Sequence, residues 1–301
     1  MIEATELTKR YGAKTAVDGL SFTVRPGLVT GFLGPNGAGK STTMRLILGL
    51  DAPSAGDVTV AGRHYRDLPA PLHEVGALLE ARAIHTGRSA LNHLLALAAT
   101  HGISRRRVDE VIELVGLSSV ARKRAGTFSL GMGQRLEIAA ALLGDPATVV
   151  LDEPVNGLDP EGIRWVRHLL RGLAAEGRTI FVSSHLMSEM AQTADHVIVV
   201  GRGRLIADMA MDAFIAQASP ALVRVRSPHA TQLRELLLGE GVTVRADGPG
   251  VLEVSGLSAE HIGEQAAEAG LTLHELSPHR ASLEAAFMEL TRDAVEYEAV
   301  A

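Results

Sequence analysis

The sequence predicts an α/β protein with a largely parallel sheet covered by helices on both faces, followed by a smaller α+β domain. Over residues 2–217, short apolar runs alternate with longer segments of helical periodicity, the order typical of parallel strands joined by crossover helices. Strands are expected at 21–24, 29–33, 148–152, 179–184 and, around a Gly-Arg-Gly turn, twice within 197–207; helices are expected at 40–49, 89–101, 105–115, 134–143 and 161–175.

The chain after residue 217 is predicted to form a domain of its own, with 216–220 as a linker. Its pattern has the order strand, helix, strand, strand, helix, strand, which is the ferredoxin-like arrangement, and one further helix follows. These elements are expected at 222–227, 230–238, 242–246, 251–255, 259–269, 271–276 and 282–291. The predicted domains are therefore 1–217 and 218–301.

Composition argues against several classes of protein. The 301 residues include no Cys, which excludes disulfides and thiolate metal sites, and no apolar run approaches the roughly 18 residues of a membrane span. The first residues lack the basic and apolar regions of a secretory signal, so we expect a cytosolic protein. The net charge of −6 arises mainly in 218–301, where six Arg stand against thirteen carboxylates. Neither domain has the basic surplus of a nucleic-acid-binding protein.

A glycine-rich stretch, GFLGPNGAGKSTT at 31–43, lies between a predicted strand and a predicted helix. It fits G-x-x-x-x-G-K-[ST], a pattern whose backbone N–H groups surround phosphates at a helix start. Lys40 is predicted to reach the β- and γ-phosphates, and the Ser41 hydroxyl to bind Mg²⁺. A glycine-rich turn without a ligand is the alternative, which the strand–loop–helix context disfavours. The residues predicted to surround the phosphates of a nucleoside triphosphate are Gly34, Pro35, Asn36, Gly37, Ala38, Gly39, Lys40, Ser41 and Thr42.

Two carboxylates follow the apolar run TVVL at 148–151. Asp152 stands at the end of a predicted buried strand, where it can hold Mg²⁺ directly or through water. Glu153 is placed to accept the proton of a water molecule that attacks the γ-phosphate. Without a phosphate loop elsewhere in the chain, the same pair would be interpreted as the cap of a turn.

A second candidate anion site precedes the helix predicted at 134–143. Ser129 and Gly131 would place a hydroxyl and exposed N–H groups at the helix start, which favours a negatively charged ligand. Ser and Gly also act as ordinary N-caps that bind no ligand. Because one phosphate loop is sufficient for one nucleotide, this second site is predicted to serve the nucleotide of another subunit.

In their order along the chain, these motifs resemble those of the nucleotide-binding subunit of ABC transporters, and the resemblance covers about 1–217. It identifies 34–42 with the family's Walker A, and VVLDEP with its Walker B and catalytic glutamate. It also implies a switch role for His185, which would contact the γ-phosphate and hold Glu153 and water in place. Further implied contacts are Tyr11 stacked on adenine, Ser129, Gly131 and Gln134 of the signature on a partner's ATP, and Asp159 of the D-loop at the subunit interface.

The chain departs from the commonest family pattern at two places. In both it resembles the bacterial drug- and antibiotic-exporter branch, which includes daunorubicin-resistance ATPases. Leu130 and Met132 replace the Gly and Gln of the signature, and Glu80 stands where the family carries its lid glutamine. Glu80 is therefore a candidate Mg²⁺ ligand, and the alternative is a solvated loop residue.

The resemblance implies an ATPase that uses ATP and Mg²⁺ and works as a pair of cassettes, expected to be two identical copies. It would energise a separate permease of the ABC-2 or a similar type at the inner face of the cell membrane, for export of drug-like or antibiotic compounds. The segment 80–101 is similar to the family surface on which the permease docks. An importer subunit is the nearer alternative, and a soluble non-transport ABC ATPase the more remote one. The C-terminal domain would either steady the dimer or sense a ligand.

Overall fold

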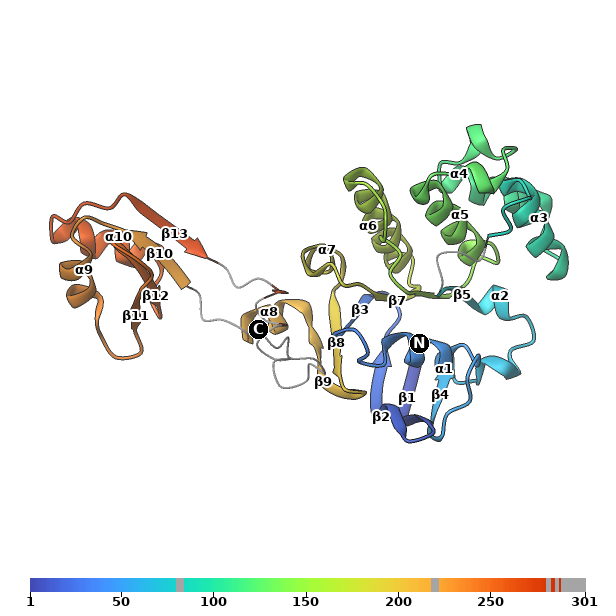
Figure 1. The fold of residues 1–301 in the computed structure, drawn as a ribbon, viewed down its shortest axis with the longest axis horizontal. Helices are drawn as coiled ribbons and strands as arrows, with labels where there is room; N and C mark the ends of the chain where they lie inside the picture. The colour runs from blue at the N-terminus through green and yellow to red at the C-terminus, as the bar shows by residue number, and fades with distance from the viewer. Residues whose placement is uncertain (80–83, 218–221, 280–282, 285–286, 288–301) are drawn as a thin grey trace. The chain divides into compact units, whose positions relative to one another are not determined.

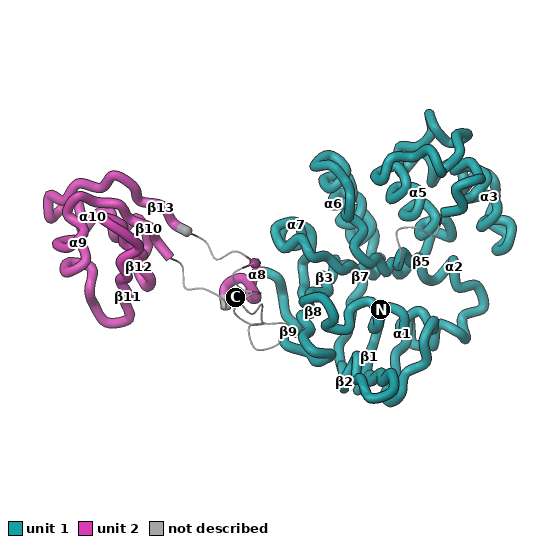
Figure 2. The backbone as a smooth tube through the Cα atoms, in the orientation of Figure 1, with its two compact units in different colours: residues 1–211, 291–301 teal, residues 212–290 magenta. Residues whose placement is uncertain are grey.

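The computed structural model describes residues 1–79, 84–217, 222–279, 283–284 and 287. The chain divides into two compact units, with Met1–Met211 in the first and Asp212–Leu290 in the second (Figure 2). Among the described residues, no helix combines the length and apolar character needed to cross a membrane. The sequence-based boundary after residue 217 remains a prediction.

The first unit contains a six-stranded sheet with the order β5-β6-β7-β3-β8-β9, parallel except for the last strand. The central strands are rich in Val, Ile and Leu and buried along their whole length, as a sheet covered on both faces requires. Their bounds are β3 Val29–Leu33, β5 Val75–Leu78, β6 Thr148–Leu151, β7 Thr179–Ser183, β8 His196–Gly201 and β9 Arg204–Ala210. The predicted parallel α/β fold is confirmed.

A second, antiparallel sheet packs beside the first, with the order β2-β1-β4. Its strands are β1 Ile2–Tyr11, β2 Lys14–Val24 and β4 Ala55–Val60. Three rings join the two sheets: Phe22 of β2 lies 6.1 Å from Phe32 and 5.9 Å from Phe181, measured between ring centroids. Only 21–24 of this sheet is predicted from the sequence, because β1 and β2 alternate buried and exposed residues and contain many charged ones.

Seven α-helices accompany these sheets in the described part of the first unit (Figure 1). They are α1 Lys40–Ile47, α2 Pro71–Glu74, α3 Ala90–Thr100, α4 Arg105–Leu114, α5 Leu130–Leu142, α6 Pro160–Ala175 and α7 Met187–Thr193. Helices α3, α4 and α5 pack on one another as a group. Helix α5 begins four residues earlier than predicted, because Ser129 accepts a hydrogen bond from the Met132 N–H and caps its first turn.

The second unit has an antiparallel sheet with the order β11-β12-β10-β13, which is the strand order of the ferredoxin-like arrangement. Its elements are α8 Met211–Gln217, β10 Leu222–Arg226, α9 Ala230–Leu237, β11 Thr243–Ala246, β12 Val251–Ser255, α10 Ala259–Glu268 and β13 Glu275–His279. Helix α8 occupies the first part of the predicted linker, and β13 starts four residues later than predicted. The helix expected over 282–291 lies almost wholly outside the described residues.

Candidate active site

The carboxyl ends of three neighbouring strands define the site. Strands β6, β7 and β3 are adjacent and parallel, so the segments that follow them leave the same edge of the sheet. These segments carry the glycine-rich loop after β3, Asp152 and Glu153 after β6, and His185 after β7. Residues separated by more than a hundred positions in the sequence therefore meet at one edge.

The loop after β3 needs glycine at two positions for different reasons. A Cβ on Gly34 would lie 2.5 Å from the Val200 carbonyl oxygen, and one on Gly39 would lie 2.4 Å from the Ala16 carbonyl oxygen. Gly39 also has φ = 99°, in the left-handed region that glycine adopts most readily. No side chain caps the start of α1, and no acidic residue lies in its first turn. The helix therefore presents N–H groups and a positive dipole end to an anion.

Lys40 lies across this loop. Its Nζ donates to the carbonyl oxygens of Gly34 at 2.6 Å and Pro35 at 3.2 Å. Burial lowers the pKa of Lys40, although the carboxylates of Glu153 and Asp152 oppose this shift. The ammonium group is therefore partly desolvated and lies within the electrostatic influence of both carboxylates.

A chain of hydrogen bonds connects the loop to the two carboxylates. Ser41 Oγ donates to Asp152 Oδ2 at 2.7 Å, and Ser183 Oγ donates to Asp152 Oδ1. The Glu153 N–H in turn donates to Ser183 Oγ at 3.0 Å. Ser183, which is fully buried at the end of β7, was not among the predicted site residues. Its only sequence signal is its place in the SSH run at the end of a predicted strand.

Glu153 and His185 form a close pair. His185 Nδ1 lies 2.7 Å from Glu153 Oε2, and the His185 N–H donates to the same oxygen at 3.2 Å. Because a carboxylate only accepts, Nδ1 carries the proton of this hydrogen bond. Glu153 has φ = 52°, a strained value for a residue with a side chain, and such strain is concentrated at functional sites. Backbone and imidazole together fix the direction of the carboxylate.

The predicted signature residues differ in their exposure. Ser129 caps α5, and a Cβ on Gly131 would lie 3.3 Å from Leu158 Cδ2, so the signature packs against the segment 156–160 of its own chain. Asp159 caps α6 by accepting the Gly162 N–H at 2.8 Å. Gln134, in contrast, is only 2% exposed and faces the interior, so its predicted contact with a partner's ATP finds no support in this placement.

Tyr11 and Glu80 complete the set of predicted residues. Tyr11 ends β1, is 48% exposed, and donates from Oη to Asp51 Oδ2 at 2.9 Å. Lys9 Nζ lies 5.0 Å from the centroid of its ring. An exposed aromatic ring at this position is available for stacking. Glu80 lies outside the described residues.

Comparison with known proteins places these motifs in a family. The model of a family described as ABC transporter matches residues 17–156. The bacitracin transport ATP-binding protein BcrA of Bacillus licheniformis is 43% identical over 215 residues, which cover 70% of each chain. The chain belongs to the ABC transporter family. The predicted family is thereby confirmed.

Other relatives of this ABC transporter ATP-binding subunit extend the comparison. An uncharacterized ABC transporter ATP-binding protein of Bacillus subtilis, YdbJ, is 33% identical over 288 residues, covering 95% of this chain and 93% of its own. A solved ATP-binding subunit of an ABC transporter matches with a TM-score of 0.66 and 27% identity, over 72% of this chain and 92% of its own. A family described as a domain of unknown function (DUF8746) matches residues 221–284.

Proposed function

We propose that this ATP-hydrolysing ABC transporter subunit drives the export of antibiotic or drug-like compounds through a separate membrane permease. The BcrA relative is named for bacitracin transport, and the lantibiotic transport ATP-binding protein SrtF of Streptococcus pyogenes is 34% identical over 214 residues, covering 70% of this chain and 92% of its own. Leu130 and Met132 in the signature agree with that branch. These relatives do not favour the importer alternative.

The observation that carries the hydrolytic part of the proposal is the chain of contacts from Ser41 through Asp152 and Ser183 to Glu153 and His185. It connects the phosphate loop to a single carboxylate that an imidazole and a backbone N–H hold in place. A base held in this way can take a proton from the water that attacks the γ-phosphate, while Lys40 and the loop N–H groups neutralise the phosphate oxygens. His185 orients Glu153, and Glu153 accepts the proton.

The metal expected with ATP is Mg²⁺, and the residues present fit it. Ser41 Oγ and Asp152 Oδ2 converge to 2.7 Å beside the phosphate loop, and hydroxyl and carboxylate oxygens are the donors that this hard cation accepts. These two residues would hold the ion, which would supply charge neutralisation at the β- and γ-phosphates. Glu80 remains a candidate third ligand, and Glu80→Gln would then raise the Mg²⁺ concentration needed for half-maximal activity.

Each ATP is proposed to lie between two chains, expected to be identical. Within one chain the helix start at Ser129 is already capped, and Leu130 is 60% exposed, so the signature presents its open face outward. A partner's γ-phosphate would meet Ser129 Oγ and the Gly131 N–H there, with Asp159 at the interface between the two chains. A partner's nucleotide would explain the second anion site, because the phosphate loop alone is sufficient for the nucleotide that the chain itself binds.

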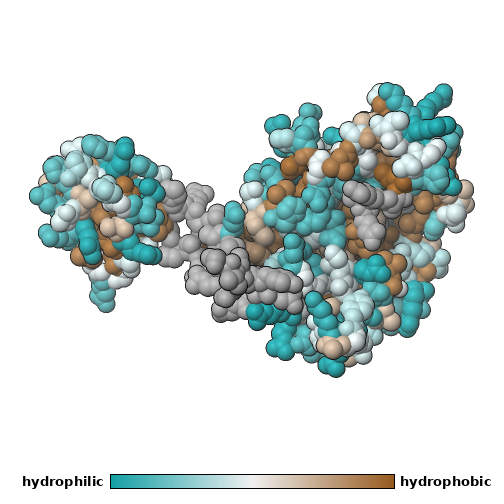
Figure 3. Space-filling model, viewed as in Figure 1, coloured by the Kyte–Doolittle hydropathy of each residue, from teal (hydrophilic) through white to brown (hydrophobic). Residues whose placement is uncertain are grey.

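The permease, of the ABC-2 or a similar type, is proposed to dock between the α3–α5 group and the sheet. A groove of about 430 Å³ lies there and is mostly apolar. Figure 3 shows hydrophobic surface beside α5 and β5 on the viewed face. Its lining includes Leu48, Leu50, Tyr65, Leu72, Leu79, Ile84, His93 and Leu97. Docking of this kind would hold the subunit on the cytoplasmic face of the cell membrane.

Two variants test the proposal by separating hydrolysis from binding. Glu153→Gln should abolish ATP turnover yet keep ATP affinity, because it removes the base and leaves the phosphate loop intact. Lys40→Ala should lose ATP affinity itself, because it removes the charge on the phosphates. Steady-state ATPase rates and equilibrium binding of a fluorescent ATP analogue measure the two effects. Near-normal turnover by Glu153→Gln would contradict the assignment of the base.

A further inference from the structure

A five-residue junction joins the two catalytic motifs of one chain. Helix α5 carries the signature at its first turn and ends at Leu142, and β6 starts at Thr148 and leads directly to Asp152 and Glu153. Residues 143–147 are therefore the covalent path that determines the angle between α5 and the sheet. Whatever fixes this junction also fixes the position of Ser129 relative to the two carboxylates.

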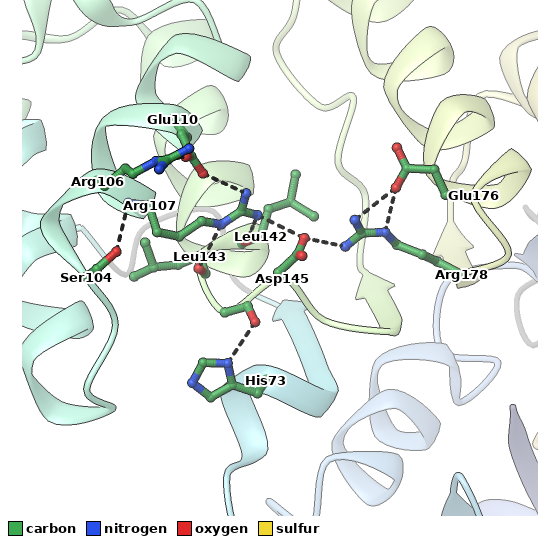
Figure 4. Close-up of polar contacts among 11 residues, drawn as sticks. His73, Ser104, Arg106, Arg107, Glu110, Leu142, Leu143, Asp145, Glu176 and Arg178 are labelled. Atoms are coloured by element: carbon green, nitrogen blue, oxygen red, sulfur yellow. Dashed lines mark hydrogen bonds and ion pairs between the residues drawn. The ribbon is translucent and has the colours of Figure 1, made fainter.

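Two arginine side chains hold the junction, one from α4 and one from the residue that precedes β7 (Figure 4). Arg107 of α4 donates from Nη2 to the Leu142 carbonyl at 2.9 Å and from Nε to the Leu143 carbonyl at 3.3 Å. These contacts satisfy carbonyls that the end of a helix leaves without partners. Arg178, just before β7, donates from Nη1 to the Pro146 carbonyl at 3.1 Å. One arginine belongs to the helical group, and the other leads directly into strand β7 of the sheet.

Asp145 connects these two arginines. Its Oδ1 accepts from Arg107 Nη2 at 3.1 Å and lies 2.9 Å from Arg178 Nη1. Glu176 holds the Arg178 guanidinium from the other side, with Nε donating at 2.9 Å. Burial by itself would lower the pKa of Arg178, but the contacts with Asp145 and Glu176 raise it above its ordinary value. Asp145 adopts φ = 57°, which turns the chain sharply between helix and strand.

The backbone of the junction also packs tightly against α2. A Cβ on Gly144 would lie 1.9 Å from the Leu72 carbonyl oxygen, and His73 Nδ1 lies 3.0 Å from the Gly144 carbonyl oxygen, to which it donates. The junction therefore has little room to shift on the side of α2. On its other side, rotation of the helical group is opposed by the contacts that Asp145 makes.

We propose that Asp145 is a positioning residue for ATP hydrolysis: by joining Arg107 to Arg178, it fixes the angle between the α3–α5 group and the sheet. This inference rests on the proposed function, since that angle matters only if Ser129 must meet the ATP of a second chain. Asp145 is 58% exposed, and exposed ion pairs contribute little to stability. Asp145 is therefore expected to affect the geometry of the protein more than its stability. Its loss should lower ATPase activity with little change in the free energy of unfolding.

Asp145→Gly is the informative variant, because glycine adopts a positive φ without strain and removes both contacts. Asp145→Asn removes only the charge, and Asn is tolerated in the left-handed region. Asp109→Asn is the matched control, since Asp109 pairs with Arg105 on the exposed surface of α4 and makes no contact with the junction. All three variants are compared in the full-length chain.

The angle can be measured directly because the chain has no Cys of its own. Two substitutions at exposed positions provide attachment sites for spin labels. Arg66→Cys lies between β4 and α2, and Arg106→Cys lies on α4. The distance distribution between the labels should be narrow in the parent chain and in Asp109→Asn, and broader in Asp145→Gly. In unlabelled protein, Asp145→Gly should lower kcat about tenfold while leaving KM for ATP nearly unchanged, with a smaller loss for Asp145→Asn.

An unchanged distance distribution in Asp145→Gly, or an equal loss of kcat in Asp109→Asn, would overturn the inference. The inference would also be overturned if Asp145→Gly lowered the melting temperature enough to unfold the protein at the temperature of the ATPase assay. The loss of kcat would then reflect a structural role of Asp145. The distance measurement needs neither nucleotide nor a second chain. If ATP is not enclosed between two chains, Asp145→Gly should still broaden the distance distribution but leave kcat unchanged, so failure of the proposed function and failure of the inference give different results.

Discussion

At the scale of single residues, glycine determines whether the phosphate loop can form. Gly39→Ala should abolish ATP binding, because its Cβ would lie 2.4 Å from the Ala16 carbonyl oxygen in addition to the strain of a positive φ. Gly62→Ala is the control: Gly62 also has a positive φ of 76°, but a Cβ there meets nothing within 4 Å. Equilibrium titration with ATP measures the difference. Similar affinity in both variants would show that the close approach has no effect on binding.

His93 should make the protein less stable in mild acid. Burial, aided by Arg88 and His85, lowers the pKa of His93 below its ordinary value of 6.5. As the pH falls through about 6.5, the unfolded chain takes up a proton that the folded chain does not, so the free energy of unfolding decreases. His93→Gln should reduce this loss. Urea unfolding at about pH 7.5 and about pH 5.5 measures it, and an identical pH dependence in the variant would contradict the prediction.

The residues of the candidate site differ in how far the sequence could predict them. Lys40, Ser41, Asp152 and Glu153 follow from local patterns, because each occupies a fixed position in a strand–loop element. Ser183 does not, since its contact with Asp152 depends on β7 lying next to β6, which is a property of the sheet order. Gln134 belongs to the signature pattern, and only the packing of α5 reveals that its side chain is buried.

At the scale of elements, the N-cap residue of α5 is expected to contribute both to the stability of the fold and to ATPase activity. Ser129→Ala removes the acceptor for the Met132 N–H and should cost about 1 kcal/mol of stability, as N-cap losses usually do. It should also lower ATPase activity, because the hydroxyl is proposed to meet a partner's phosphate. Ser258→Ala makes the same change at the cap of α10, where Ser258 Oγ accepts the His261 N–H, and should leave ATPase activity unchanged. Equal activities would exclude a role of the hydroxyl in the reaction.

The elements that sequence patterns predicted best are those whose pattern has a local cause. Buried strands such as β3 are continuous apolar runs, and helices such as α4 have the expected periodicity. The antiparallel sheet was mostly missed, because β1 owes its stability to pairing with β2 and β4 and not to an apolar run. The start of β13 was also misplaced, since its first residues pair with β10 from a distant part of the chain.

At the scale of the whole molecule, the two units have separate hydrophobic cores. One cluster includes Leu7, Phe32 and Phe181, and another includes Val225, Leu233 and Val254. A chain ending at residue 217 should therefore fold and bind ATP with the affinity of the full chain, because all the residues of the phosphate loop lie before that point. Circular dichroism and ATP titration measure this outcome. Failure of the shortened chain to bind ATP would contradict the predicted domain boundary.

The central claim is that two chains enclose each ATP and that Glu153 hydrolyses it. Light scattering of Glu153→Gln measures this most directly, since a variant that binds ATP without hydrolysing it should remain in the enclosed state. We expect the molar mass to rise with ATP from that of one chain, 31.8 kDa, to twice that value. Adding Gly131→Asp should prevent the increase while ATP binding persists, because a carboxylate would face the partner's γ-phosphate. A mass that stays at one chain while Glu153→Gln is saturated with ATP would contradict the account.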